Sequence, residues 1–391
     1  MNATPQPTIR IGLIGTSWWA DAMYLPALSS LSDVAVTAIA GRRPGPLAER
    51  ASQWDIAATY ADWRDMLDRA DLDGVIIAAA NSVHHPAALA ALRRDLAVLC
   101  EKPLAGTAGE AHELAELADQ RQAVTMVPFT YAFMPGFRWL RRLVREGYVG
   151  RVHHVGLRYH TGFGLDPAYN WKFDARRNPT GALGDIGSHF IHLAIELAGP
   201  ISHVTAQMDT LGSRATTDPD GQSYPAASDA AILILGFEGG AQGVLHASAV
   251  AHEGTSMDQR HMIEVHGSAG TLAYKIDWDE VQIVTGSRVG EGPVRPLPIP
   301  DDIWGPVRRS PIHDTYRDVF RTTDAMARGW AQAIAPRRQV RPDFADGAAV
   351  QQVLEAALAS STSGRRVALD PPAGERPSAR PRTGSPEMEP K

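Results

Sequence analysis

The first 130 residues alternate between short apolar runs and segments of helical periodicity, and this rhythm limits the possible folds more than any other feature. The apolar runs lie at 9–15, 34–40, 74–80, 96–100 and 124–129. Continuous apolar runs separated by helices are typical of βαβ units, whose parallel strands are buried on both faces. Because such crossovers are right-handed, the pattern predicts a doubly wound parallel sheet of the α/β class over residues 1–130.

The rhythm changes near residue 150. Strand-like stretches there are joined by short turns such as 237–240 and 267–270, where glycine supplies the positive φ that a tight turn needs. These turns predict a mostly antiparallel open sheet, and helical segments at 181–198, 313–334 and 343–362 make the second domain, residues 131–370, α+β. Residues 371–391 hold six prolines and little apolar content, which predicts a disordered tail.

Composition argues against several classes of function. The net charge is −6, with 38 basic against 44 acidic residues, so a nucleic-acid partner is not expected. Cys100 is the only cysteine, which excludes an intrachain disulfide and a thiolate-rich metal site. No apolar run reaches the length of a membrane span, and residues 1–10 lack the pattern of a signal peptide. We therefore expect a cytoplasmic protein with no metal, nucleic-acid or membrane partner.

The first apolar run ends in a modified dinucleotide-binding fingerprint. Of the three glycines in G-x-G-x-x-G only Gly15 is present, and Ser17 and Ala20 take the other two positions. The helix that follows would offer its dipole and N–H groups to a pyrophosphate. A tight turn in another kind of doubly wound protein would look the same. The expected cofactor contacts are Gly15, Thr16, Ser17, Trp18 and Trp19.

The second apolar run is followed by Gly41, Arg42 and Arg43. An NAD-selective site usually has Asp or Glu here to bind the ribose 2′-hydroxyl, whereas guanidinium groups suit a 2′-phosphate. The sequence therefore predicts that NADP(H) is preferred and that NAD(H) is possible. The alternative is that both arginines are merely solvated on a surface loop.

Three further motifs carry a family resemblance. They are Asn81-x-x-His84, Glu101-Lys102-Pro103 and Asp185-x-x-x-His189. In this order and spacing the chain resembles the Gfo/Idh/MocA family, named for glucose–fructose oxidoreductase and inositol dehydrogenase. The resemblance implies a Rossmann domain followed by an α+β domain, with the active site between them. It also implies a homodimer or homotetramer formed through the open sheet.

The resemblance also implies roles for individual residues. Lys102 would contact the reacting hydroxyl or carbonyl, His189 would give and take the proton, and Asp185 would orient the substrate or the histidine. Chemistry agrees, because histidine accepts a proton near neutral pH and an ammonium stabilises charge that builds on oxygen. Each residue also has a purely structural interpretation. Lys102 could be an exposed loop lysine, His189 a histidine that only packs in the core, and Asp185 an aspartate favoured at the start of a helix. The nicotinamide side of the site is expected to include Ala80, Asn81, His84, Glu101 and Lys102.

The glycine- and aromatic-rich loop at 161–179 is the candidate substrate loop. Aromatic faces pack against the C–H surfaces of sugar rings, and a lysine binds hydroxyls, so Trp171 and Lys172 are expected to join Lys102, Asp185 and His189 around the substrate. An aromatic staple that holds the loop down is the alternative. Two departures from the family pattern are His192, where relatives often have aspartate, and Ala132, where many have arginine.

Together these observations predict an NAD(P)-dependent oxidoreductase that interconverts a secondary alcohol and a ketone on a sugar, inositol or related polyhydroxy compound. Two other classes stay open: a regulator that binds NADP and a sugar without turnover, and an NAD(P)-assisted glycoside hydrolase. The identity of the sugar is not predicted.

Overall fold

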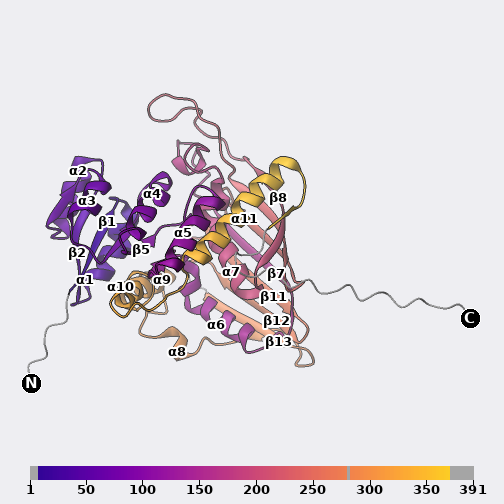
Figure 1. Cartoon of the computed structure of the whole chain (residues 1–391). Helices are drawn as coiled ribbons and strands as arrows, with labels where there is room; N and C mark the ends of the chain where they lie inside the picture. The colour runs from indigo at the N-terminus through magenta and orange to yellow at the C-terminus, as the bar shows by residue number, and fades with distance from the viewer. Residues whose placement is uncertain (1–7, 280–281, 370–391) are drawn as a thin grey trace, which may run out of the picture.

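The computed structural model describes residues 8–279 and 282–369. The tail predicted at 371–391 lies outside the described residues. The described chain forms two sheets that lie side by side with helices between them (Figure 1).

The first sheet has six parallel strands in the order β3-β2-β1-β4-β5-β6. They are β1 Ile9–Ile14, β2 Val34–Ala40, β3 Ala58–Tyr60, β4 Gly74–Ile77, β5 Ala97–Cys100 and β6 Thr125–Met126. The strand order reverses direction between β1 and β4, so the carboxyl ends of these two strands flank the crevice where doubly wound sheets bind ligands. The doubly wound sheet predicted from the apolar runs is confirmed.

Short helices connect these strands and cover the two faces of the sheet. They are η1 Ala20–Tyr24, α1 Leu25–Ser29, α2 Pro44–Gln53, α3 Trp63–Arg69, α4 Asn81–Leu92 and α5 Ala108–Gln120. The sequence explains why α5 begins where it does. Thr107 and Glu110 form a reciprocal capping box, in which each side chain accepts a hydrogen bond from a backbone N–H at the start of the helix.

The second sheet has nine strands in the order β14-β13-β12-β11-β7-β10-β9-β8-β15. Every neighbouring pair is antiparallel except β7 with β10. The strands are β7 Val152–Thr161, β8 Ile201–Asp209, β9 Ala230–Phe237, β10 Gln242–Ser248, β11 Gln259–Gly267, β12 Gly270–Ile276, β13 Gln282–Arg288, β14 Arg295–Pro296 and β15 Val367–Ala368. The mostly antiparallel sheet predicted for the second domain is confirmed.

Helices cover one face of this second sheet, the face turned toward the first domain (Figure 1). Side chains alternate accordingly along β7, where Leu157 and Tyr159 are buried and Arg158 is half-buried on the opposite face. Residues 188–194 of helix α7 are all buried, because the helix lies between the sheet and α11. The covering elements are η2 Thr130–Phe133, α6 Pro135–Arg145, η4 Leu183–Gly187, α7 Ser188–Ala198 and α11 Phe344–Ser363.

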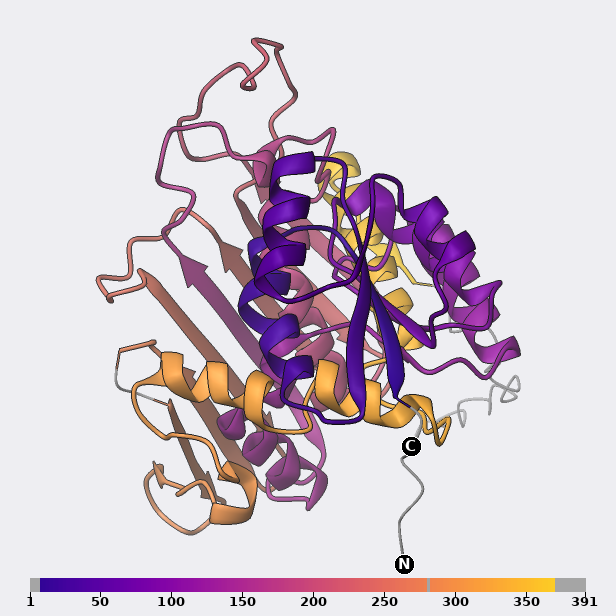
Figure 2. The ribbon, with the colours of Figure 1, turned by 90° about the vertical axis from the view of Figure 1, so that its left-hand side faces the viewer.

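The helical segment predicted at 313–334 is two helices rather than one. Helix α9 spans Ile312–Thr322 and α10 spans Ala327–Ile334, and the chain turns between them at Met326, which has a φ of +48°. A helix cannot continue through that backbone conformation. Both helices pack against α1 of the first domain, and α9 also packs against η1, as Figure 2 shows for the orange segment beside the indigo one. A remaining short helix, α8, spans Asp301–Trp304.

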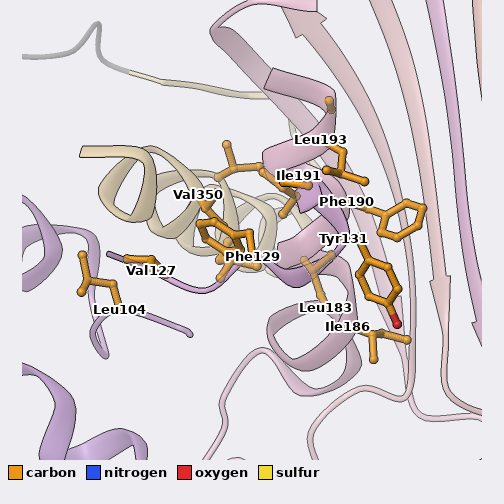
Figure 3. Close-up of a cluster of buried hydrophobic side chains, with 14 of the residues drawn as sticks. Leu104, Val127, Phe129, Tyr131, Leu183, Ile186, Phe190, Ile191, Leu193 and Val350 are labelled. Atoms are coloured by element: carbon orange, nitrogen blue, oxygen red, sulfur yellow. The ribbon is translucent and has the colours of Figure 1, made fainter. Parts of the chain in front are cut away.

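One hydrophobic cluster continues from the first domain into the second. Figure 3 shows Leu104, which follows β5, and Val127 beside Phe129, with the buried side chains of α7 next to them. Because these residues are close-packed, the cluster fixes α7 relative to the end of β5. It therefore sets the geometry of the site that these two elements share.

Candidate active site

A cavity of about 920 Å³ lies at the carboxyl ends of the first sheet. Its lining includes the turn after β1, the turn after β2 and the start of α4. Residues predicted to bind a cofactor make up much of this lining: Gly15, Thr16, Ser17, Arg42, Arg43, Ala80 and Asn81. The second domain contributes Trp171, Arg176 and Arg177.

The turn after β1 fits a dinucleotide phosphate. Gly15 has a φ of +112°, and a Cβ on this residue would lie 2.3 Å from the carbonyl oxygen of Ala78. Only glycine therefore allows the backbone to pass this close to the end of β4. Ser17 Oγ accepts a hydrogen bond from the N–H of Ala20 at 3.2 Å, which leaves its hydroxyl proton able to donate toward a bound phosphate.

The two tryptophans of this turn do not line the cavity. Trp18 is 72% exposed, and Trp19 packs edge-on against Tyr316 of α9 with ring centroids 6.3 Å apart. Trp19 thus helps to hold η1 against the helices that return from the second domain. A cofactor contact by either residue stays a prediction.

The Lys102 side chain meets Asp185 where the two domains join. Lys102 Nζ lies 3.0 Å from Asp185 Oδ1 and 2.5 Å from its backbone oxygen. On the other side of the same carboxyl, Lys172 Nζ lies 2.8 Å from Oδ2. Burial opposes the charged form of Asp185, but the two ammonium groups outweigh burial and hold the pKa of this carboxyl below its usual value. The structure thus brings together three of the predicted site residues.

His189 lies in the first turn of α7, directly after the η4 turn that carries Asp185. Its side chain is buried, and Nδ1 has no hydrogen-bond partner among the described residues. Burial, together with the positive charge of Lys102, lowers the pKa of His189 well below its usual value. His189 is therefore neutral at neutral pH, which is the form that accepts a proton.

Glu101 and His84 brace the loop that carries Lys102. Glu101 accepts hydrogen bonds from the Tyr24 hydroxyl and from the Lys102 N–H, the latter at 3.1 Å, and burial raises its pKa. His84 Nδ1 lies 2.7 Å from the carbonyl oxygen of Pro103 and Nε2 lies 3.2 Å from that of Ala79, and burial lowers the pKa of the ring. Neither residue is part of the cavity lining, and a cofactor contact by either stays a prediction.

His192, which stands where relatives often have aspartate, packs against an aromatic side chain. Its ring stacks on Phe129 at a centroid distance of 4.7 Å, and burial lowers its pKa to about 4. Phe129 in turn contacts His189 edge-on at 6.1 Å. Phe129 thus lies between the rings of His192 and His189.

The sequence reasoning missed a cluster of polar side chains beside His189. Tyr131 contacts the His189 ring at 5.2 Å, and its hydroxyl lies 2.9 Å from that of Tyr159. Gln259 Nε2 is 3.1 Å from both hydroxyls and 2.8 Å from His261 Nε2. The sequence held one signal for this cluster. Tyr159 and His261 lie on the buried faces of strands, and buried polar side chains need hydrogen-bond partners.

Within the described residues no helix is long and apolar enough to cross a membrane.

Family models match most of the chain. The model described as the oxidoreductase family with an NAD-binding Rossmann fold matches residues 9–129, and the GFO/IDH/MocA C-terminal domain matches residues 137–273. The first match spans all six strands of the parallel sheet, and the second spans β7 to the middle of β12 in the nine-stranded sheet.

Several dehydrogenases are similar over nearly the full length. Levoglucosan dehydrogenase from Pseudarthrobacter phenanthrenivorans is 28% identical over 83% of this chain and 86% of its own length. Inositol 2-dehydrogenase from Rhizobium meliloti is 27% identical over 93% of this chain and 99% of its own. A solved levoglucosan dehydrogenase in complex with NADH and levoglucosan superimposes with a TM-score of 0.81 at 25% identity, covering 93% of this chain and 99% of that one.

Proposed function

The chain belongs to the Gfo/Idh/MocA oxidoreductase family, and from that premise we propose that it interconverts a secondary alcohol and a ketone on a sugar, an inositol or a related polyhydroxy compound. The observation that carries this proposal is the buried group formed by Lys102, Asp185, Lys172 and His189. It lies between a cavity that fits a dinucleotide and a sheet that offers polar side chains.

A bound nicotinamide cofactor would supply the chemistry of hydride transfer, taking the hydride from the alcohol carbon or returning it to the ketone. The protein has to move the hydroxyl proton. His189 is neutral and buried, so in the oxidation direction it accepts that proton, and in the reduction direction it gives the proton back.

Lys102 stabilises the substrate oxygen. Asp185 holds the Lys102 ammonium through its carboxylate and its backbone oxygen, which fixes the position of the ammonium and leaves its third N–H donor to bind the oxygen on which charge builds. Lys172, on the far side of Asp185, presents a second ammonium for the neighbouring hydroxyls of a polyol. Tyr131, Tyr159 and Gln259 add donors and acceptors suited to further hydroxyls.

We propose that NADP(H) is preferred over NAD(H). Five arginines and a single aspartate line the cavity formed by the described residues. Arg42 and Arg43 directly follow β2, where a carboxylate would select NAD(H), and the aspartate, Asp62, caps α3 by accepting from the Arg64 N–H at 2.9 Å. The similar levoglucosan dehydrogenase was solved with NADH, so the support for NADP(H) comes from these arginines alone.

The outer face of the second sheet supports a homodimer or homotetramer. Ile232, Ile234 and Val244 lie on the neighbouring strands β9 and β10 and are 45%, 57% and 49% exposed. Adjacent exposed aliphatic side chains on an uncovered sheet mark an interaction surface. We propose that a second copy of this chain covers them, as the family resemblance implies.

The test is a panel of sugars and cyclitols assayed with NAD⁺ and with NADP⁺, following the absorbance of the reduced cofactor. We expect turnover of at least one polyol, with a higher kcat/KM for NADP⁺. Lys102→Met and His189→Ala should each lower kcat by about 10²–10⁴-fold, and His266→Ala, on the outer face, should not. Full activity in both site variants would refute the assigned roles, and binding without turnover would favour the regulator.

A further inference from the structure

The segment 170–178 of the second domain touches both halves of the site. At one end, Lys172 Nζ binds Asp185 Oδ2 at 2.8 Å. At the other end, Asn81, the first residue of α4, donates from Nδ2 to the backbone oxygen of Arg177 at 3.3 Å. This loop therefore connects the catalytic carboxylate with the cofactor cavity of the first domain.

Two neighbouring arginines of this loop have different surroundings. Arg176 is engaged within the second domain, because its Nη2 lies 2.6 Å from Asp174 and 2.9 Å from Asp218. Arg177 is 56% exposed, and its one ion-pair contact among the described residues is a long one, from Nε to Asp174 at 3.7 Å. The Nη atoms of Arg177 are thus available for a ligand, whereas Nε and Nη2 of Arg176 are already bound to carboxylates.

Arg177 lines the cavity on the β4 side of β1, where the diphosphate is the cofactor's nearest anionic group. Its backbone is fixed to the first residue of α4, which follows β4, and β4 is the neighbour of β1. In doubly wound sheets the pyrophosphate binds at the turn after the first strand. The strand β2, with Arg42 and Arg43 after it, lies on the opposite side of β1. The strand order therefore separates Arg177 from the two arginines suited to a 2′-phosphate.

We propose that Arg177 is a cofactor ligand supplied by the second domain, and that it binds the diphosphate common to NAD(H) and NADP(H). This inference rests on the proposed function. The N-terminal end of α4, which no side chain caps, adds positive potential at the same place. Arg177 and Lys172 lie on the same loop, 170–178, and Lys172 binds Asp185. A cofactor bound to Arg177 therefore stabilises the position of this loop and of the Lys172–Asp185 contact.

The experiment is a set of binding measurements by calorimetry, with no substrate and no turnover. The probes are NADP⁺, NAD⁺, ADP and adenosine, and the variants are Arg177→Ala, Arg177→Lys and the control Arg69→Ala. Arg69 is a matched control because it is 71% exposed, forms a similarly long contact at 3.9 Å and lies outside the cavity. Circular dichroism and thermal unfolding check that each variant is folded.

We expect Arg177→Ala to weaken NADP⁺, NAD⁺ and ADP by the same factor, about five- to thirty-fold, which is the range for a partly exposed charge-assisted hydrogen bond. Adenosine binding should not change, because adenosine has no phosphate. Arg177→Lys should give an intermediate loss, since lysine keeps the charge but not the forked geometry. Arg69→Ala should bind all probes like the wild type.

Three results would count against the inference, and each is distinct. Unchanged binding of ADP and both dinucleotides in Arg177→Ala would overturn it and leave the proposed function intact. A loss confined to NADP⁺ would place Arg177 at the 2′-phosphate and overturn the diphosphate contact. If the wild type bound neither dinucleotide, the proposed function itself would fail.

Discussion

Replacing Asp185 with asparagine keeps the shape of the side chain and removes the charge that two lysines share. Lys102 and Lys172 lie 3.0 Å and 2.8 Å from its two oxygens, and the aspartate side chain is only 12% exposed. Removing one partner of a buried ion pair costs about 3–5 kcal/mol, because the remaining charge stays buried without its counter-ion. The lysines are 16% and 32% exposed, so we expect a loss near the lower limit, about 3 kcal/mol in the free energy of unfolding.

The lowered pKa of Asp185 sets the pH dependence of this loss. In the folded protein the pKa lies below that of an unfolded aspartate, about 3.9. The charged carboxylate therefore stabilises the fold above about pH 4, and its contribution is lost as the pH falls through the folded pKa. The difference in stability between the wild type and Asp185→Asn should be constant around neutral pH and should shrink in acid.

Activity should respond in two ways. The kcat/KM should fall by about 10²–10³-fold, because the Lys102 ammonium loses the group that positions it. The pKa of His189 should fall further, since the Asp185 charge is one of the factors that raise it. His189 acts as a base only when neutral, so the acidic limb of the pH–rate profile should move to lower pH in the variant.

Urea unfolding followed by circular dichroism measures the first effect, and initial rates across pH measure the second. Asp95→Asn is the matched control, because Asp95 pairs with Arg121 at 2.9 Å but is 61% exposed, and such surface pairs contribute about 0–1 kcal/mol. If Asp185→Asn unfolded at the same urea concentration as this control and kept its kcat/KM within about two-fold, the reasoning from the buried lysine–aspartate contacts would be wrong.

Two further predictions concern residues that support the site, and a third concerns the outer face of the second sheet. Tyr24→Phe removes the hydroxyl that braces the Lys102 loop, and kcat should fall about three- to ten-fold with the KM for the cofactor unchanged, as steady-state rates would show. Gly15→Ala places a Cβ against the Ala78 carbonyl, so thermal unfolding should show a loss of more than about 1 kcal/mol and calorimetry a weaker cofactor affinity. Ile234→Glu puts a charge on the outer sheet face, and light scattering should show a shift toward monomer; an unchanged mass would mean that another surface forms the oligomer.

The parallel sheet was predictable because its strands are buried on both faces. Such strands appear in the sequence as continuous apolar runs, and those at 34–40 and 96–100 match β2 Val34–Ala40 and β5 Ala97–Cys100 to within a residue. The helix predicted at 313–334 was wrong in one respect, because the break at Met326 is a backbone turn that no glycine or proline marks in the sequence.

Part of the candidate site was also predictable. The family resemblance identified Lys102, Asp185 and His189 as candidates, and the local pattern agreed, because Lys102 follows a predicted strand and the other two are spaced for one side of a helix start. The side chains that surround them come from distant segments. Tyr131, Gln259 and His261 meet only because β11 pairs with β7 and η2 packs against α7.

The sequence by itself determined the class of each sheet, because strand periodicity depends on residues close together in the chain. Its resemblance to a known family also identified Lys102, Asp185 and His189 as site candidates. The tertiary structure alone decided that Lys172 shares Asp185 with Lys102, that His84 and Glu101 brace a loop, and that Arg177 reaches the cofactor cavity. The physical reason is that these contacts join residues that local periodicity does not relate. Only burial and packing between the two domains bring them within hydrogen-bonding distance.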